Sequence, residues 1–248
     1  MRVHASDLRQ PFARLTSQAR IGYSPRCAKE FMKTKLTHDL LKKEAAKFAE
    51  IETKYDELTL YGVTDGKAVG TYLEHKFTKF LAENYDYEHG NSASGIDLPC
   101  LGVDIKVTSI KQPQSSCPFK SATQKVYGLG YCLLIFVYEK SDNHDARTGR
   151  LNMNHTIFVE KEQTADFQTT KGISGILERE GNKDDLLAFI EERNLPLDEI
   201  GANELAERIL KQPPEMGFLT ISNALQWRLQ YGRVISKAGE VDGVIRIR

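Results

Sequence analysis

Hydrophobic and polar positions alternate over residues 101–108, which predicts a β-strand with one buried face. The two faces of that strand carry Leu101, Val103, Ile105 and Val107 on the apolar side and Gly102, Asp104, Lys106 and Thr108 on the other. On the polar face the carboxylate of Asp104 therefore stands beside the ammonium of Lys106, with the two backbone positions roughly 7 Å apart. The plainest interpretation is an exposed ion pair on an amphipathic strand.

A shorter apolar stretch precedes this strand and adds a second carboxylate. Residues 96–98 are typical of a short strand in which Asp97 has apolar neighbours, and residues 99–102 have the composition of a turn. A tight reversal there would bring Asp97 beside Asp104. Two adjacent carboxylates repel each other unless a cation neutralises them, so a hard divalent metal ion is the expected occupant. Lys106 would then lie within reach of whatever the ion holds.

The remaining periodicities predict a succession of helices and strands. Helices are expected over residues 37–57, 67–83, 119–128, 164–180, 184–193 and 203–210, and strands over residues 85–89, 131–138 and 155–160. Thr37 is the expected N-cap of the first helix. Residues 131–138 are apolar throughout, which is typical of a strand buried on both faces. Residues 67–140 therefore have an α-β-β-β-α-β order, which predicts a mixed α/β (α+β) fold.

Polar segments separate these elements. Residues 110–118 and 141–150 are predicted loops. The short helix over residues 119–128 is expected to expose three polar side chains, those of Lys120, Gln124 and Lys125. Near the C-terminus, a helix capped by Ser222 and a hairpin over residues 233–248 complete the chain. This order fits either a winged helix or a part that extends the sheet.

The helix over residues 67–83 carries a candidate site residue beside its apolar face. That face is formed by Val69, Leu73, Phe77 and Phe80. Gly70 would permit a close approach to a sheet. Glu74 falls about a quarter-turn from the centre of the face, so its carboxylate can point toward a site at the sheet edge. The alternative is a surface glutamate that pairs with a nearby lysine.

The 248 residues have a formal net charge of zero, but the charges are distributed unevenly. Residues 1–44 carry ten Arg or Lys against four acids, and residues 211–248 carry six against three. Residues 178–209 carry ten acids against four bases. A neutral total can therefore hide a basic face that binds nucleic acid.

Composition predicts a soluble protein in a reducing compartment. No apolar run approaches the roughly 20 residues that span a bilayer, and the N-terminus lacks the apolar centre of a signal peptide. Four cysteines lack metal-ligand spacing, so we expect reduced thiols and a cytoplasmic location. We expect an arm and helix over residues 1–60, a catalytic core over 61–165 and a helical and hairpin part, a possible DNA-recognition subdomain, over 166–248.

These features together resemble the PD-(D/E)xK nuclease superfamily, which includes most Type II restriction endonucleases. In that family an acid ends one strand and an acid-x-lysine follows on the next, as Asp97, Asp104 and Lys106 do here, and many members add a helical glutamate, here Glu74. The short gap between the two aspartates is similar to that of MutH-like mismatch-repair nicking enzymes and their restriction-enzyme relatives. Ile96 departs from the family pattern, because it stands where the family name places proline.

The resemblance implies a restriction-endonuclease-like fold and Mg²⁺-dependent hydrolysis of DNA at a specific double-stranded sequence. Asp97, Asp104 and the carbonyl of Ile105 would hold Mg²⁺, with Mn²⁺ as a substitute and Ca²⁺ supporting binding without cleavage. Lys106 would position or help deprotonate the attacking water and offset negative charge. Glu74 would ligate a second ion or orient a water molecule. Double-stranded DNA is the expected partner, bound by a homodimer or a monomer, and no membrane is involved.

Other functions remain open on the sequence alone. The same fold would suit a mismatch-repair nickase or a structure-specific nuclease. A DNA-binding module with a degenerate nuclease core would lack cleavage, and an unrelated α/β domain would carry the constellation by chance. For DNA contacts we expect the polar loop, the short helix after it and the basic C-terminal segment to contribute Lys111, Gln112, Gln114, Ser115, Lys120, Arg228, Arg233 and Lys237.

Overall fold

The computed structural model describes residues 33–88, 90, 95–117, 120–222 and 227–248. The expected N-terminal arm lies almost entirely in residues 1–32, outside the described residues. The helices are α1 His38–Thr53, α2 Gly66–Asn84, α3 Gln124–Tyr127, α4 Phe167–Glu178, α5 Lys183–Glu192, α6 Glu199–Lys211 and α7 Gly232–Lys237. The strands are β1 Thr34–Lys35, β2 Asp56–Glu57, β3 Tyr85–Asp86, β4 Val103–Ser109, β5 Gln114–Cys117, β6 Cys132–Asn143, β7 Thr148–Val159, β8 Thr220–Ile221, β9 Trp227–Gln230 and β10 Val244–Arg246.

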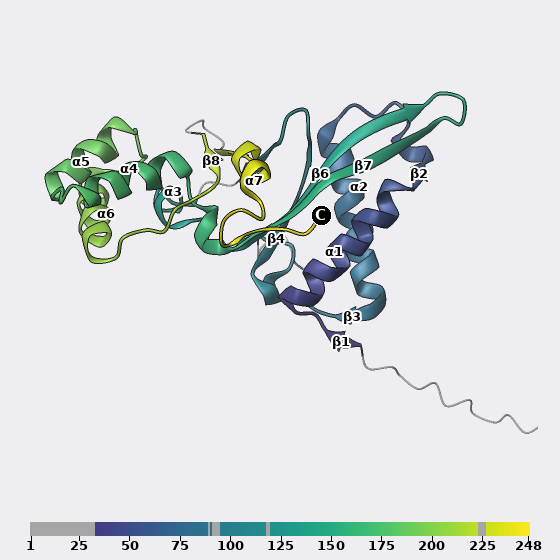
Figure 1. Cartoon of the computed structure of the whole chain (residues 1–248), viewed down its shortest axis with the longest axis horizontal. Coiled ribbons are helices and arrows are strands. Elements are labelled where there is room, and N and C mark those ends of the chain that lie inside the picture. The colour runs from purple at the N-terminus through teal and green to yellow at the C-terminus, as the bar shows by residue number, and fades with distance from the viewer. Residues whose placement is uncertain (1–32, 89, 91–94, 118–119, 223–226) are drawn as a thin grey trace, which may run out of the picture. The chain divides into compact units, whose positions relative to one another are not determined.

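A mixed sheet of order β10-β7-β6-β4 forms the centre of the fold, and β2 pairs with β7 (Figure 1). β4 and β6 are parallel, whereas β6 and β7 are antiparallel. Successive side chains of β6 enter two different cores: Leu134 and Phe136 face one, Leu133 and Ile135 the other. The predicted strand buried on both faces is therefore confirmed, and so is the mixed α/β class.

Helices α1 and α2 cover one face of this sheet, where the side chain of Phe48 packs against those of Phe77 and Phe136. Thr37 caps α1 as predicted, because its hydroxyl accepts a hydrogen bond from the Leu40 amide. The prediction that α1 continues to residue 57 is wrong. The chain leaves the helix after Thr53 and pairs with β7 as strand β2, an interaction between distant segments that local periodicity does not reveal.

The other face of the sheet is covered by elements that the sequence assigned differently. The predicted loop over residues 110–118 contains strand β5, and the helix predicted after Ser222 is instead strand β9 where the structure describes it. β5, β9 and β8 form a separate three-stranded sheet. The first strand of the predicted C-terminal hairpin is helix α7, and β10 pairs with β7. The described C-terminal segments therefore form no winged helix.

Three further predictions around the central strands are wrong or only partly met. The predicted loop over residues 141–150 is the outer end of a long β6–β7 hairpin, in which the backbones pair while most polar side chains remain exposed. The predicted strand over residues 96–98 makes only one bridge, between Leu98 and Val103. The predicted strand over 85–89 is limited to β3 in the described residues.

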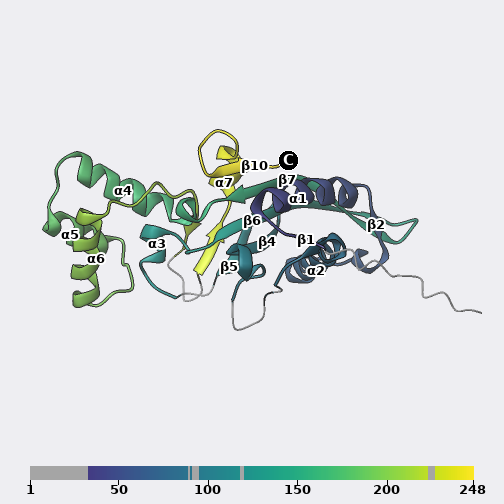
Figure 2. The same ribbon diagram turned by 90° about the horizontal axis from the view of Figure 1, so that it is seen from below.

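Helices α3 to α6 form a separate hydrophobic core around Val126, Ile173 and Leu205 (Figure 2). Gln124 and Lys125, predicted to be exposed, are buried there at the start of α3. A short helix cannot point every polar residue outward when it is packed on two sides. The domain boundaries expected at residues 60 and 165 stay predictions.

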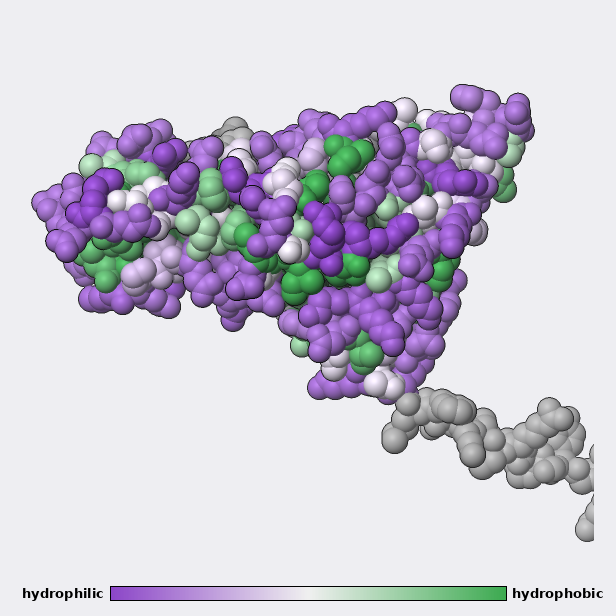
Figure 3. Space-filling view, in the orientation of Figure 1, coloured by the Kyte–Doolittle hydropathy of each residue, from purple (hydrophilic) through white to green (hydrophobic). Residues whose placement is uncertain are grey.

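The view in Figure 3 shows a mostly hydrophilic face with small, separate hydrophobic patches. Among the described residues, none of the helices has the length and apolar character required to cross a membrane.

Candidate active site

The turn between the two aspartates has the geometry that the sequence predicted. Pro99–Leu101 form one 3₁₀ turn, and Gly102 adopts the left-handed conformation (φ 61°), which glycine does without strain. The Leu98 amide donates to the Val103 carbonyl at 3.0 Å, and the Val103 amide donates to the Leu98 carbonyl at 3.2 Å. This closed reversal places Asp97 next to the beginning of β4.

The carboxyl groups of Asp97 and Asp104 are in hydrogen-bonding contact. One oxygen of Asp97, Oδ2, also accepts a hydrogen bond from the Ile105 amide at 2.7 Å. Asp104 is only 5 % exposed. Burial, together with the nearby Asp97, raises the pKa of Asp104 to about 7, even though Lys106 acts in the opposite direction. Without a cation, Asp104 therefore holds its proton up to about neutral pH.

Lys106 lies two residues further along β4, on the same strand face as Asp104. Its Nζ atom is 2.6 Å from Oδ2 of Asp104. Burial alone would lower the pKa of Lys106, but the charges of Asp104 and Asp97 outweigh it and raise the pKa above its ordinary value. The side chain is thus a partly buried, charged ammonium.

Glu74 joins this group from helix α2. It is half-buried, and burial together with the charges of Asp97 and Asp104 raises its pKa to about 7, against the opposing effect of Lys106. A side-chain hydrogen bond also links it to Asp97. No ion pair with a lysine holds Glu74 in the part of the chain that the structure describes, so the surface-pair alternative does not apply to this geometry.

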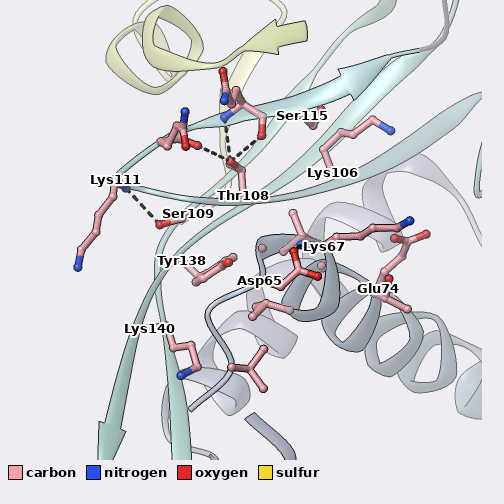
Figure 4. Close-up of a pocket in the computed structure, with 18 of the residues that line it drawn as sticks. Asp65, Lys67, Glu74, Lys106, Thr108, Ser109, Lys111, Ser115, Tyr138 and Lys140 are labelled. Carbon is pink, nitrogen blue, oxygen red and sulfur yellow. Dashed lines mark hydrogen bonds between the residues drawn. The ribbon is translucent and has the colours of Figure 1, made fainter. Parts of the chain in front are cut away.

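A cleft of about 1110 Å³ opens beside these residues. Lys106 lines it from β4 and Glu74 from α2, and Figure 4 shows the two side chains on facing sides. Most of the residues predicted to contact DNA also line this cleft, namely Lys111, Gln112, Gln114, Ser115 and Arg228. The polar segment after β4 and strand β9 thus meet in one place, although they are far apart in the sequence.

Three predicted DNA-contact residues lie outside the cleft lining. Lys120 is exposed. The guanidinium of Arg233 stacks 3.5 Å from the centre of the Phe167 ring, and Lys237 forms a 2.9 Å ion pair with Glu240. Their part in DNA binding stays a prediction.

The sequence did not single out several other residues of the cleft. Lys67 lies two helical turns before Glu74 on α2, a spacing that signals a shared face. Tyr138, Lys140 and Asp142 line the cleft from the outer half of β6, and Lys140 is ion-paired with Asp142. The predicted strand ended at residue 138, whereas β6 continues to Asn143. A longer predicted strand would have placed these three alternate residues on one face.

The residues present fit a divalent ion whose ligand shell is only partly supplied by the protein and is completed by the expected DNA substrate. Although Asp97 contacts both Asp104 and Glu74, no three His, Cys, Asp or Glu side chains of the described residues are arranged to hold a metal ion by themselves. Mg²⁺, however, commonly binds through one or two carboxylates together with substrate phosphates and water. Asp97 and Asp104 supply two adjacent carboxyls. β4 lies at the edge of the main sheet, and the Ile105 amide points toward Asp97, so the Ile105 carbonyl points to the same side.

Comparison with known proteins identifies the family. A family model described as Type II restriction enzyme NspV matches residues 35–246. The chain is also 64 % identical over 214 residues to the Type II restriction enzyme NspV of Nostoc sp. (strain ATCC 29411 / PCC 7524), covering 86 % of this chain and 97 % of that protein. The chain belongs to the NspV family of type II restriction enzymes. No solved structure matches it.

Family membership selects among the functions that the sequence left open. The chain is a sequence-specific restriction endonuclease that acts on double-stranded DNA, as predicted from the resemblance. Restriction enzymes of this type generally need a divalent metal ion, which agrees with the donor set around Asp97 and Asp104. The nickase and non-catalytic alternatives are therefore set aside.

Proposed function

We propose that this restriction enzyme cleaves DNA by Mg²⁺-dependent hydrolysis at a PD-(D/E)xK-type site formed by Asp97, Asp104, Lys106 and Glu74. The observation that supports the proposal most strongly is the buried contact between the two aspartates, with a charged lysine 2.6 Å away. Such a group is unfavourable as a purely structural element, because burial of like charges costs free energy. It becomes favourable when a cation and a phosphate occupy the site.

Asp97, Asp104 and the Ile105 carbonyl are the residues that would hold the ion. When bound, Mg²⁺ supplies Lewis-acid stabilisation of charge on the phosphate and activation of water. The Ile105 amide fixes one oxygen of Asp97, and Lys106 occupies Oδ2 of Asp104 in the structure. The other oxygen of Asp97 and Oδ1 of Asp104 would therefore hold the ion first, and Oδ2 of Asp104 would follow once Lys106 turns away. Mn²⁺ should replace Mg²⁺, since both prefer oxygen ligands, and Ca²⁺ should support binding alone.

Lys106 exchanges partners when substrate arrives. In the structure it neutralises Asp104. With a cation held by the aspartates, the ammonium would be free to turn toward the scissile phosphate, where it would position the attacking water and offset developing negative charge. Glu74, on the facing side of the cleft, orients a water molecule or contributes to a second ion site, because its carboxylate lies near Asp97 and Lys106.

Positive side chains on both walls of the cleft would hold the DNA backbone near this site. Lys67 lies on the α2 wall, and Lys111 follows β4. Both are exposed, and no described residue forms an ion pair with either. Lysines in this position contact phosphates and fix the orientation of the duplex. Whether one or two chains act together, as a monomer or homodimer, stays a prediction that sedimentation analysis can decide.

The decisive experiment is cleavage of supercoiled plasmid DNA by the Asp104→Asn variant. We expect wild-type enzyme to linearise the plasmid in Mg²⁺ and Asp104→Asn to leave it intact, because the amide cannot neutralise a cation. DNA binding in Ca²⁺ should largely survive. Asp145→Asn, at the exposed tip of the β6–β7 hairpin, is the matched control and should cleave normally. Cleavage by Asp104→Asn at the wild-type rate, or metal-independent cleavage by the wild type, would refute the proposal.

A further inference from the structure

Strands β5 and β9 form an antiparallel ribbon with one polar face. Gln114 pairs with Gln230, and Ser116 pairs with Arg228. Directly opposed residues of antiparallel strands project their side chains to the same side, so these four residues share one face. We refer to the face formed by Gln114, Ser116, Arg228 and Gln230 as the outer face of the ribbon.

The opposite face holds the ribbon firmly on the protein. Leu229 and Cys117 are almost completely buried there. The Ser115 hydroxyl lies 2.5 Å from the hydroxyl of Tyr231, which is itself fully buried. At the start of the ribbon, the Gln114 amide donates to the Thr108 hydroxyl of β4 at 2.9 Å. The outer face is therefore presented from a rigid support that is hydrogen-bonded to the strand carrying Lys106.

The outer-face side chains are available for a partner. Ser116, Arg228 and Gln230 are exposed and Gln114 is partly exposed. Within the described part of the chain, no side-chain hydrogen bond or ion pair occupies the Arg228 guanidinium or either glutamine amide. An arginine without an acidic partner retains its full capacity for a bidentate interaction. Gln114, Ser116 and Arg228 also line the cleft that Lys106 lines.

We propose that the outer face of the β5–β9 ribbon makes the direct base contacts in the major groove of the DNA substrate; this rests on the proposed function. A two-stranded ribbon fits the major groove, where glutamine pairs with adenine N6 and N7 and arginine with guanine O6 and N7. Rows two residues apart on a strand are roughly 7 Å apart. That distance corresponds to about two base-pair steps. The Gln114–Gln230 pair and the Ser116–Arg228 pair therefore contact base pairs about two steps apart.

Binding measurements with single-base-pair variants of the target test this assignment. The target is first read from the fragment ends that the wild-type enzyme produces. Affinities of Gln114→Ala, Gln230→Ala and Arg228→Ala are then measured in Ca²⁺ for the target and for every DNA that differs from it at one base pair. Gln168→Ala and Arg179→Ala, exposed on or beside α4, are the matched controls.

We expect Arg228→Ala to lose about tenfold or more of its discrimination at one G·C pair and to keep it elsewhere. Gln230→Ala should do the same at an A·T pair about two steps away, and both controls should discriminate as the wild type does. Uniform weakening across all sequences, or unchanged discrimination, would overturn the proposal, because the ribbon would then contact only phosphates or no DNA. Binding in Ca²⁺ requires no cleavage, so a failure of the proposed chemistry at Asp104 would be seen separately, in the plasmid assay.

Discussion

Glu74→Gln offers a test of the site that does not depend on measuring cleavage. The Glu74 carboxyl has its pKa raised from an ordinary 4.5 to about 7 by burial and by Asp97 and Asp104. Its ionisation therefore destabilises the folded protein in the absence of metal. Glutamine has nearly the same shape, stays neutral and can still donate a hydrogen bond to Asp97. The substitution should make the metal-free protein more stable at high pH.

The expected size of the effect follows from the pKa. A rise from 4.5 to about 7 corresponds to an upper limit of roughly 3 kcal/mol. Because Glu74 is only half-buried, solvent screening reduces this to about 1–2 kcal/mol. In a protein of this size, that difference shifts the melting temperature by roughly 2–8 °C.

The pH dependence has a definite sign. Below pH 4.5 the carboxyl is protonated in both folded and unfolded protein, so wild type and Glu74→Gln should melt together. Between pH 4.5 and 7 the unfolded wild-type protein ionises first, and its folded state loses stability relative to the variant. Above pH 7 the difference should be constant.

Thermal melts in EDTA at several pH values, followed by melts in Mg²⁺, complete the assay. Mg²⁺ should stabilise the wild type more than Glu74→Gln, because the carboxylate then faces a cation. Glu83→Gln, exposed at the end of α2, should follow the wild type throughout. If Glu74→Gln melts with the wild type at pH 8 in EDTA, or below it, the electrostatic argument for this site is wrong.

Three further predictions concern catalysis, DNA binding and packing. Lys106→Met keeps the bulk of the side chain but not its charge and should slow cleavage about a hundredfold or more while DNA binding in Ca²⁺ persists; a near-normal rate would reduce Lys106 to a structural ion pair. Lys111→Ala should lower the slope of log affinity against log salt by about 1, as measured by anisotropy titrations, and an unchanged slope would remove Lys111 from the phosphate contacts. Gly149→Ala should destabilise the fold by about 1–3 kcal/mol in urea denaturation, because the new Cβ would lie 2.8 Å from atoms of Leu60. Gly175→Ala, whose new Cβ meets no described atom within 4 Å, is its control; equal stability of the two variants would contradict the packing argument.

The candidate site could be predicted because it depends on short-range sequence. Asp97, the turn and Asp104 lie within eight consecutive residues, and Lys106 follows on the same strand. Strand alternation and turn composition therefore fix their relative positions without knowledge of the rest of the fold. Glu74 required one further step, the orientation of an amphipathic helix toward the sheet edge, and its apolar stripe supplied that orientation.

The elements that we propose face the DNA could not be predicted in the same way. Residues 114–117 have no apolar alternation, and their pairing partner begins 113 residues after Gln114, at Trp227. Local composition therefore favours a loop, and only the tertiary pairing makes a strand. The same reason explains why the strand predicted to begin at Arg233 is a helix. Residues 233–236 are compatible with a strand, but in the fold they form part of helix α7, which packs Val234 into the core beneath β5 and β9.

In the proposed function, the elements that contact bases and those that cleave are directly connected. β4 carries Asp104 and Lys106 at its beginning and middle and Thr108 near its end. The Thr108 hydroxyl accepts from the Gln114 amide and lies 3.2 Å from the carbonyls of Gln112 and Gln114 (Figure 4). A base contact that moves the ribbon must therefore move, or be resisted by, the same strand that positions Lys106. Because β4 is also paired along its length with the buried strand β6, we expect the main sheet to resist displacement of the ribbon and so to keep Lys106 in place.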